Sequence, residues 1–109
     1  MKSTLLSPRT AELVDAVFAA EEREGARTLL EERCGTNLPV LSGLDPIQLE
    51  RYRFAAIRVS QGDLKGLEGA ISLANTDWRD LLMQADFAHD TQAHERWCAN
   101  VLGAAGSAL

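Results

Sequence analysis

The segment Asp45–Gln61, DPIQLERYRFAAIRVSQ, carries the strongest helix signal in the chain. Asp45 is a typical N-cap residue, Pro46 suits the first helical position, and the side chain of Gln48 can reach back to the cap. Apolar residues occupy two sides of such a helix, with Leu49, Tyr52, Ala56 and Val59 on one side and Ile47, Phe54 and Ile57 on the other. Because a helix that is apolar on two sides is normally covered on both, we expect this segment to be the central helix of the fold.

Two shorter helices are expected before it, because apolar residues recur at spacings of three and four and alternation of strand length is hard to find. The first is predicted over residues 8–21, with Ser7 as N-cap and Pro8 at the first helical position. The second follows the apolar stripe of residues 26–34. In one continuous helix the two stripes would lie on nearly opposite sides, so we expect a break near residues 22–25 and a helical hairpin.

Between the hairpin and the central helix, residues 36–44 contain a proline, a glycine and four large apolar residues. This composition predicts a structured loop that packs Leu38, Val40 and Leu41 inward. Three more helices are expected after the central one, each begun by a capping residue. They are predicted from Asp63 to about Asn75, from Thr76 or Asp77 to about Phe87, and from Asp90 or Thr91 to Leu102.

Length and helix spacing together predict one all-α domain. A chain of 109 residues with 46% hydrophobic content is the size of one globular unit. Short connections favour antiparallel neighbours, so we expect five or six short helices in a compact orthogonal bundle or a short helix-pair array over residues 1–102. Residues 103–109 are predicted to be a flexible tail. The residues expected to share one core are Val17, Leu30, Phe54, Ile57, Trp78, Leu81 and Leu82.

Charge and cysteine content limit the possible partners and compartments. A formal net charge of −5 opposes the counterion release that drives nucleic-acid binding, so no nucleic-acid partner is expected. No secretory signal is recognisable, and the apolar run 16–20 is far shorter than the roughly 20 residues that span a bilayer, so no membrane association is expected. Cys34 and Cys98 are far apart and form no C-x-x-C motif, which favours a reducing compartment, the cytoplasm.

The densest group of potential metal ligands is Asp86, His89, Asp90, His94, Glu95 and Cys98. His94 is one helical turn from both Asp90 and Cys98. A zinc or iron site needs three or four converging ligands, however, and no signature such as H-E-x-x-H is present. We interpret the group as a capped, solvated helix start and predict no metal. The alternative is a small enzyme or metal-dependent switch that uses the region of His89 and His94.

Neither cysteine has the surroundings of a nucleophile. Cys98 is expected in the middle of a helix on an apolar stripe, and Cys34 follows Glu31 and Glu32 at a helix C-terminus, where the local potential raises the pKa of a thiol. Neighbouring carboxylates elsewhere point in different directions on their helices, and no glycine-rich phosphate loop occurs. The sequence therefore predicts no catalytic residue and no cofactor.

Arg51 and Arg58 lie two turns apart on one face of the central helix. Such a pair can hold a carboxylate or phosphate through bidentate hydrogen bonds, so both are candidate anion contacts. The alternative is that these arginines pair with acids of neighbouring helices.

Two surfaces are candidates for protein contacts. Trp78 and Arg79 are of the residue types that dominate interface hot spots. The alternative is that Trp78 packs in the core and Arg79 bonds nearby acids. Trp97, Val101 and Leu102 lie close to the end of the chain, where few later residues can cover them. These three residues predict a symmetric homodimer, with a monomer as the alternative.

Many apolar stripes and few chemically competent groups favour a non-enzymatic protein-interaction or regulatory module. Its expected partner is another protein or a second copy of the chain. Leu38-Pro39 after Cys34-Gly35, together with segments 51–60 and 77–82, resembles small bacterial helical proteins, and this resemblance implies no activity.

Overall fold

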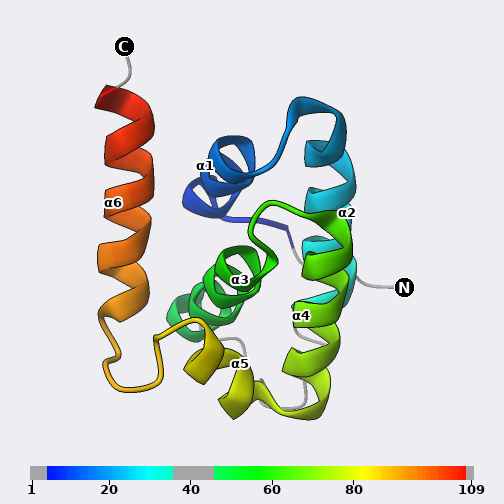
Figure 1. Cartoon of the computed structure of the whole chain (residues 1–109), viewed down its shortest axis with the longest axis vertical. Helices are drawn as coiled ribbons and strands as arrows, with labels where there is room; N and C mark the ends of the chain where they lie inside the picture. The colour runs from blue at the N-terminus through cyan, green and yellow to red at the C-terminus, as the bar shows by residue number, and fades with distance from the viewer. Residues whose placement is uncertain (1–4, 36–45, 108–109) are drawn as a thin grey trace.

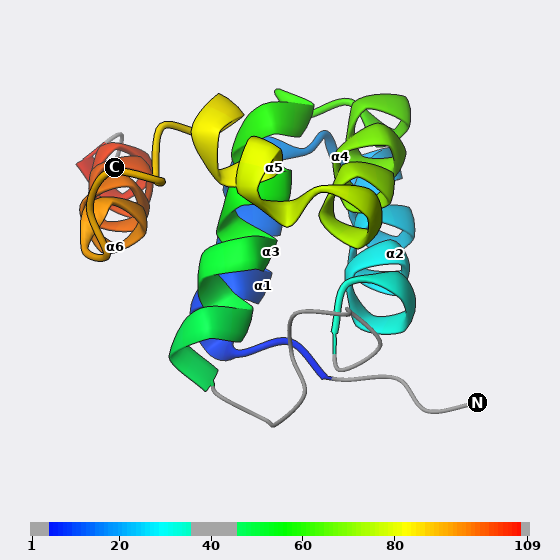
Figure 2. The same cartoon turned by 90° about the horizontal axis from the view of Figure 1, so that it is seen from below.

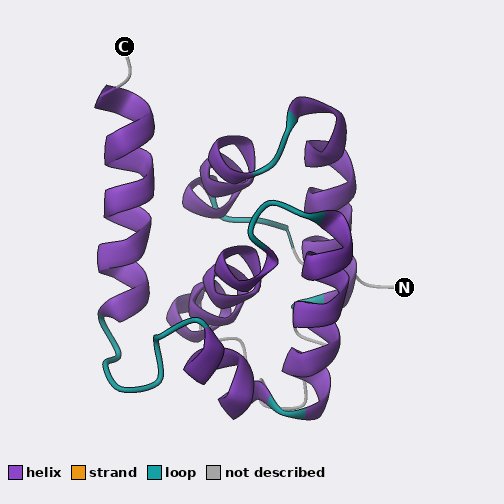
Figure 3. Ribbon diagram, viewed as in Figure 1, coloured by secondary structure: helices purple, strands orange, loops and turns teal. Residues whose placement is uncertain are grey.

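The computed structural model describes residues 5–35 and 46–107, and this part of the chain contains helices and no strand (Figure 3). Its elements are α1 (Pro8–Val17), the 3-10 turn η1 (Ala20–Glu22), α2 (Arg23–Arg33), α3 (Pro46–Ser60), α4 (Leu64–Thr76), α5 (Trp78–Gln84) and α6 (Ala93–Ser107). The all-α prediction is confirmed. The predicted cap Asp45 and the loop 36–44, with Leu38, Val40 and Leu41, lie outside the described residues. None of the helices described is long and apolar enough to cross a membrane.

The helices form an orthogonal bundle of three layers. The middle layer consists of α1 and α3, and Figure 1 looks almost along both of them while α2, α4 and α6 run up the page. Figure 2 shows α2 and α4 on one side of this layer and α6 on the other. One end is closed by α5, which contacts α3 and α4.

The helix predicted to be central is central. Helix α3 contacts α1, α4, α5 and α6, and it is buried on more than one side. Five of its apolar residues are at most 3% exposed: Tyr52, Phe54, Ala55, Ala56 and Ile57. Val59 is only partly buried, and Ile47, in the first turn, is 62% exposed.

Most of the predicted core is buried. Leu30, Phe54, Ile57, Leu81 and Leu82 belong to one buried cluster. Val17 and Trp78 pack against this cluster but remain partly exposed. Val17 is the last residue of α1 and Trp78 the first of α5, so each lies at a helix end, where fewer neighbours surround it.

Two separate helices are confirmed in place of one continuous helix, but they cross steeply and do not form the predicted hairpin (Figure 1), and the first helix is shorter than predicted. It ends at Val17, because Phe18 adopts an extended conformation (φ −98°, ψ 147°) and its side chain is buried. The carbonyl of Phe18 then accepts a hydrogen bond from Nε of Arg23 at 3.1 Å. Gly25, where a break was expected, lies inside α2. A Cβ at Gly25 would lie 3.3 Å from Cδ1 of Leu64, which indicates close packing of α2 on α4.

The turn between α3 and α4 requires glycine. Gly62 has φ of +80°, and a Cβ there would come within 2.6 Å of the Val17 carbonyl oxygen. Asp63 then caps α4 by accepting a hydrogen bond from the backbone N–H of Gly66 at 2.9 Å. Asp77 caps α5 in the same way, so both predicted caps are confirmed.

Helix α6 is longer than predicted. It follows Asp90, whose Oδ1 accepts a hydrogen bond from the backbone N–H of Gln92 at 2.8 Å. It continues to Ser107, past Leu102, where the sequence placed the start of a tail. The added turn contains two alanines, which have the highest helix propensity of all residues.

Candidate functional site

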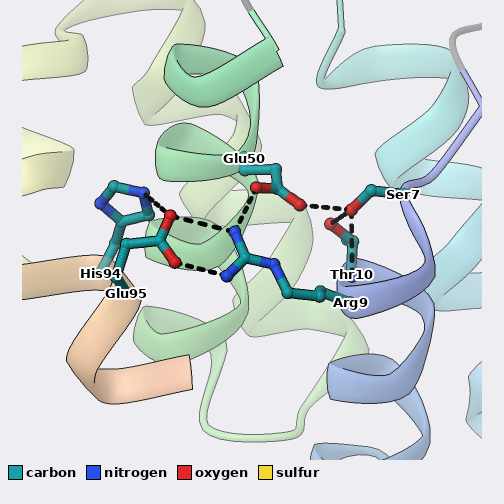
Figure 4. A network of polar contacts seen from close by, with 6 residues as sticks. All are labelled: Ser7, Arg9, Thr10, Glu50, His94 and Glu95. Atoms are coloured by element: carbon teal, nitrogen blue, oxygen red, sulfur yellow. Dashed lines mark hydrogen bonds and ion pairs between the residues drawn. The ribbon is translucent and has the colours of Figure 1, made fainter. Parts of the chain in front are cut away.

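A polar cluster connects α1, α3 and α6 (Figure 4). The guanidinium of Arg9 donates from Nη2 to Oε1 of Glu50 at 2.5 Å and to Oε1 of Glu95 at 3.0 Å, and from Nη1 to Oε2 of Glu95. The hydroxyl of Ser7 donates to the other oxygen of Glu50 at 2.6 Å and accepts from the backbone N–H of Thr10 at 3.3 Å. One arginine therefore links two carboxylates on two other helices.

The charges in this cluster stabilise one another. Hydrogen bonds from Arg9 lower the pKa of Glu95, and the hydrogen bonds to Glu95 and Glu50 raise the pKa of Arg9. The side chains are 41% exposed for Arg9, 33% for Glu95 and 17% for Glu50, so water and salt partly screen the network.

His94 is the one fully buried titratable group in the cluster. Its ring packs against Phe54 and Phe87, with ring centroids 5.7 Å and 6.2 Å away. Nε2 lies 3.5 Å from Oε1 of Glu95, but neither ring nitrogen forms a hydrogen bond. Burial lowers the pKa of His94, against the opposing effect of Glu95. The imidazole is therefore neutral at pH 7.

The geometry suits cross-linking of helices better than catalysis. Both carboxylates that could act as a base already accept hydrogen bonds from Arg9. The nearby thiol of Cys98 is buried, and burial raises its pKa, which keeps it from being a nucleophile at neutral pH.

The six residues predicted as potential metal ligands do not converge. Asp86 and His89 are exposed in the connection before α6, with Oδ1 and Nδ1 3.6 Å apart. Asp90 instead bonds Arg96. His94 and Glu95 belong to the polar cluster. Within residues 5–35 and 46–107, no group of three or more His, Cys, Asp or Glu side chains is arranged to hold a metal.

A second arginine, Arg53, is buried on the opposite side of the middle layer. Its guanidinium donates to the backbone carbonyls of Cys34 at 2.8 Å, Leu5 at 2.9 Å and Leu30 at 3.3 Å. Two of these carbonyls belong to the C-terminal end of α2, where the helix dipole favours a cation.

Both cysteines are free and buried. The pKa of Cys34 is raised to about 12 by burial, and the charge of Arg53 offsets only part of this effect. The sequence predicted a raised pKa for Cys34 because of the acids beside it, whereas in the structure the main cause is burial.

Arg51 and Arg58 line two different hollows. Arg51 donates from Nη2 to the Phe87 carbonyl at 2.8 Å. The guanidinium of Arg58 lies over the rings of Phe87 and Trp97, at 5.4 Å and 6.0 Å from their centroids. The two guanidiniums therefore do not line one common hollow, and neither forms an ion pair with an acid of the described residues.

Trp78 and Arg79 lie together at a hollow of about 350 Å³, lined by Arg51, Trp78, Arg79, Leu82, Met83 and Ala88. We call it the Trp78 hollow. The indole of Trp78 meets the ring of Tyr52 edge-on, with centroids 5.9 Å apart, and Arg79 stacks over the indole at 5.1 Å. Met83 is 67% exposed beside them.

Trp97, Val101 and Leu102 are partly covered by their own chain. All three pack against the buried core, and the ring of Trp97 lies 6.2 Å from Phe54 and 5.9 Å from Phe87. The predicted dimer surface on α6 is thus half-buried in the single chain.

Several residues of these sites had no signal in the sequence. Arg9 is 41 residues from Glu50 and 86 from Glu95, and no local pattern joins partners at such separations. Met83 lies outside the apolar stripe of α5, so periodicity does not single it out. A basic residue such as Arg53 gives no local indication that it is buried.

Comparison with protein-family models, with curated proteins and with solved structures finds no match to this chain. The functional argument therefore rests on the residues of the chain itself.

Proposed function

We propose that this protein is a non-enzymatic helical protein that binds a protein partner through the Trp78 hollow. The observation that carries the proposal is the exposed Met83 beside a stacked tryptophan and arginine. Tryptophan and arginine are enriched in interface hot spots, and an exposed methionine adapts its shape to a partner.

The charge of the hollow indicates what kind of partner fits it. Arg51 and Arg79 both line it, in a chain whose net charge is −5. Among the described residues Arg79 stacks on the ring of Trp78 and forms no hydrogen bond or ion pair, which leaves its N–H groups for acceptors on a partner. A segment that carries apolar side chains flanked by carboxylates matches this arrangement.

The same charges argue against a second copy of the chain at this surface. A two-fold axis through the hollow would bring Arg51 and Arg79 of one copy to face those of the other, and like charges across an interface oppose binding. Self-association through Trp97, Val101 and Leu102 is a separate prediction. A single monomer mass in sedimentation equilibrium at high micromolar concentration would exclude it.

A protein partner fits the chain better than a nucleic acid, because the net charge of −5 opposes binding to phosphate backbones. Two free, buried thiols support a reducing compartment, and we place the protein in the cytoplasm.

The test is affinity capture of the tagged protein from its host cells, with quantification by mass spectrometry. The wild type is compared with Met83→Glu, which puts a negative charge into the hollow. Ile47→Glu is the matched control, because Ile47 is 62% exposed at the start of α3 and does not line the hollow.

We expect at least one protein to be captured by the wild type and by Ile47→Glu but not by Met83→Glu. Its binding should weaken with added salt, because Arg51 and Arg79 contribute to it. If every captured protein is retained equally by Met83→Glu, the Trp78 hollow is not the binding surface.

A further inference from the structure

A second hollow, of about 220 Å³, opens between α6 and the connection of residues 85–92, next to α3. We call it the Arg58 hollow. The hydrogen-bond donors that line it are the side chains of Arg58, His89, Arg96 and Asn100, and the indole of Trp97 forms part of its wall. It lies apart from the Trp78 hollow, with which it shares no lining residue.

Arg58 is held in place without using its hydrogen-bonding capacity. Its guanidinium lies over the rings of Phe87 and Trp97, at 5.4 Å and 6.0 Å, and within the described residues it has no carboxylate or carbonyl partner. Stacking on aromatic faces orients the plane of a guanidinium and leaves the N–H groups at its edge available.

Arg96 adds a second cation at the same hollow. It donates from Nη2 to Oδ2 of Asp90, which occupies only part of its capacity, because a guanidinium has five N–H donors. One carboxylate, that of Asp86, also lines the hollow, and it lies 3.6 Å from the ring of His89. Asp86 is 76% exposed, so water weakens its repulsion of an anion without removing it.

We propose that the Arg58 hollow binds the phosphate group of a small phosphomonoester. A phosphate carries a charge of about −1.5 to −2 at pH 7 and three strong acceptor oxygens. Its oxygens can therefore meet donors from Arg58, Arg96 and Asn100 at once. A carboxylate has two oxygens in one plane and fits a single arginine fork, so it would use fewer of these donors.

The size of the hollow indicates more than a bare phosphate ion. Its 220 Å³ is several times the roughly 30 Å³ that one water molecule occupies in the liquid. Trp97 lines the same hollow and can pack with a small organic group. The ligand class is thus a phosphorylated small molecule.

The test uses the two tryptophans as internal reporters. Their indole N–H groups give two signals in ¹H–¹⁵N spectra, assigned with a Trp78→Phe variant. The protein is titrated with inorganic phosphate, with O-phosphoserine and with acetate. We expect phosphate and O-phosphoserine to shift the Trp97 signal saturably, with O-phosphoserine binding more tightly, and the Trp78 signal to remain unchanged. No saturable shift of Trp97 by either phosphate compound, or equal binding of acetate, would overturn the proposal.

Variants locate the binding. Arg58→Gln should weaken phosphate binding by about tenfold or more, because it removes a charged, bidentate donor. Arg79→Gln is the matched control, since Arg79 also stacks on a tryptophan but lies at the other hollow, and its effect should stay within about twofold. Equal weakening of phosphate binding by both variants would show that phosphate is attracted by the arginines in general, and would overturn the proposed site.

A third variant tests the site without removing any of its donors. Asp86→Asn deletes the one negative charge that lines the hollow, and should tighten phosphate binding by about twofold to fivefold. Asp86 has φ of +63°, a conformation that asparagine tolerates well, so the fold should be retained. Unchanged or weaker binding in this variant would contradict the proposal even if Arg58→Gln failed to fold.

Discussion

Arg53 and Arg9 each hydrogen-bond an outer helix to the middle layer, and their acceptors differ in kind. Arg53 is 1% exposed and donates to backbone carbonyls at the end of α2 and in the N-terminal segment. Arg9 is 41% exposed and donates to the carboxylates of Glu50 and Glu95. Carbonyls do not titrate, whereas carboxylates do. The attachment of α2 to the middle layer should therefore be strong and independent of pH. The attachment of α6 should be weaker and sensitive to acid and salt.

The largest effect is expected from Arg53→Met. It leaves the buried carbonyls of Cys34 and Leu30 and the partly buried carbonyl of Leu5 without the donor they have in the fold. A buried carbonyl left without a donor costs about 1–3 kcal/mol, so the loss of unfolding free energy should be about 3 kcal/mol or more. Urea denaturation at pH 7 measures this, with Arg27→Met as control, because the pair of Arg27 and Asp15 is exposed and contributes less than about 1 kcal/mol. A loss below about 1 kcal/mol for Arg53→Met would show that the two arginines do not differ in this way.

A smaller loss, of about 1–2 kcal/mol, is expected from Arg9→Met. Its network is partly screened, but the variant leaves Glu50, which is 17% exposed, without its cation. Native-state hydrogen exchange should show faster exchange in α6, with little change in α4, because α6 contacts the rest of the chain through α1 and α3. Equal acceleration in both helices would mean that α6 has no independent opening.

Features that depend on residues close together in the sequence could be predicted, and features that depend on distant residues could not. The caps Ser7, Asp63 and Asp77 and the apolar stripes act within one or two helical turns, and the sequence predicted them correctly. The end of α1 at Val17 is determined by burial of Phe18 against other helices, which no local pattern contains.

The candidate sites also differ in whether their residues are close together or far apart in the sequence. Trp78 and Arg79 are neighbours in sequence, and the structure brings them together as one local unit, with Arg79 over the indole. The pairing of Arg51 with Arg58 was also local in origin, but a residue far along the chain, Phe87, meets each of them with a different group, its carbonyl for one and its ring for the other. The carboxylate partners of Arg9 are likewise long-range, so the polar cluster had no signal in the sequence.

Acid should first weaken the packing of α6 on the middle layer, because His94 and Glu95 both lie on α6. Burial lowers the pKa of His94, so below about pH 6.5 the unfolded chain takes up a proton that the folded chain does not, and stability falls. The charged groups that act on His94 are Glu95 and Glu50, which favour its protonation, and Arg51 and Arg9, which oppose it. Hydrogen bonds from Arg9 lower the pKa of Glu95, so its contribution is present above the unfolded pKa and is lost as the pH falls through the folded pKa.

The unfolding free energy of the wild type should therefore decrease between pH 7.5 and pH 5 by at most about 1.4 kcal/mol per pH unit, the limit for one proton. Replacement of His94 by Phe should flatten this slope, and His89→Gln, at an exposed position, should leave it as it is. An unchanged slope in the His94 variant would exclude His94 as its source.

The smallest effect is expected from Arg9→Lys, which keeps the charge and removes the fork that reaches both carboxylates. A change of well under 1 kcal/mol is difficult to resolve by denaturation, but the two buried thiols can report it separately. Cys98 lies on α6 and Cys34 at the end of α2 beside Arg53. Because a buried thiol reacts only when its surroundings open, alkylation of Cys98 should be about threefold faster in Arg9→Lys than in the wild type, and alkylation of Cys34 should be unchanged. The rates are measured by mass spectrometry of peptides at a fixed alkaline pH, since burial raises the pKa of both thiols. An equal increase at the two cysteines would mean that Arg9 stabilises the bundle as a whole, and the two sides of the middle layer would then open together.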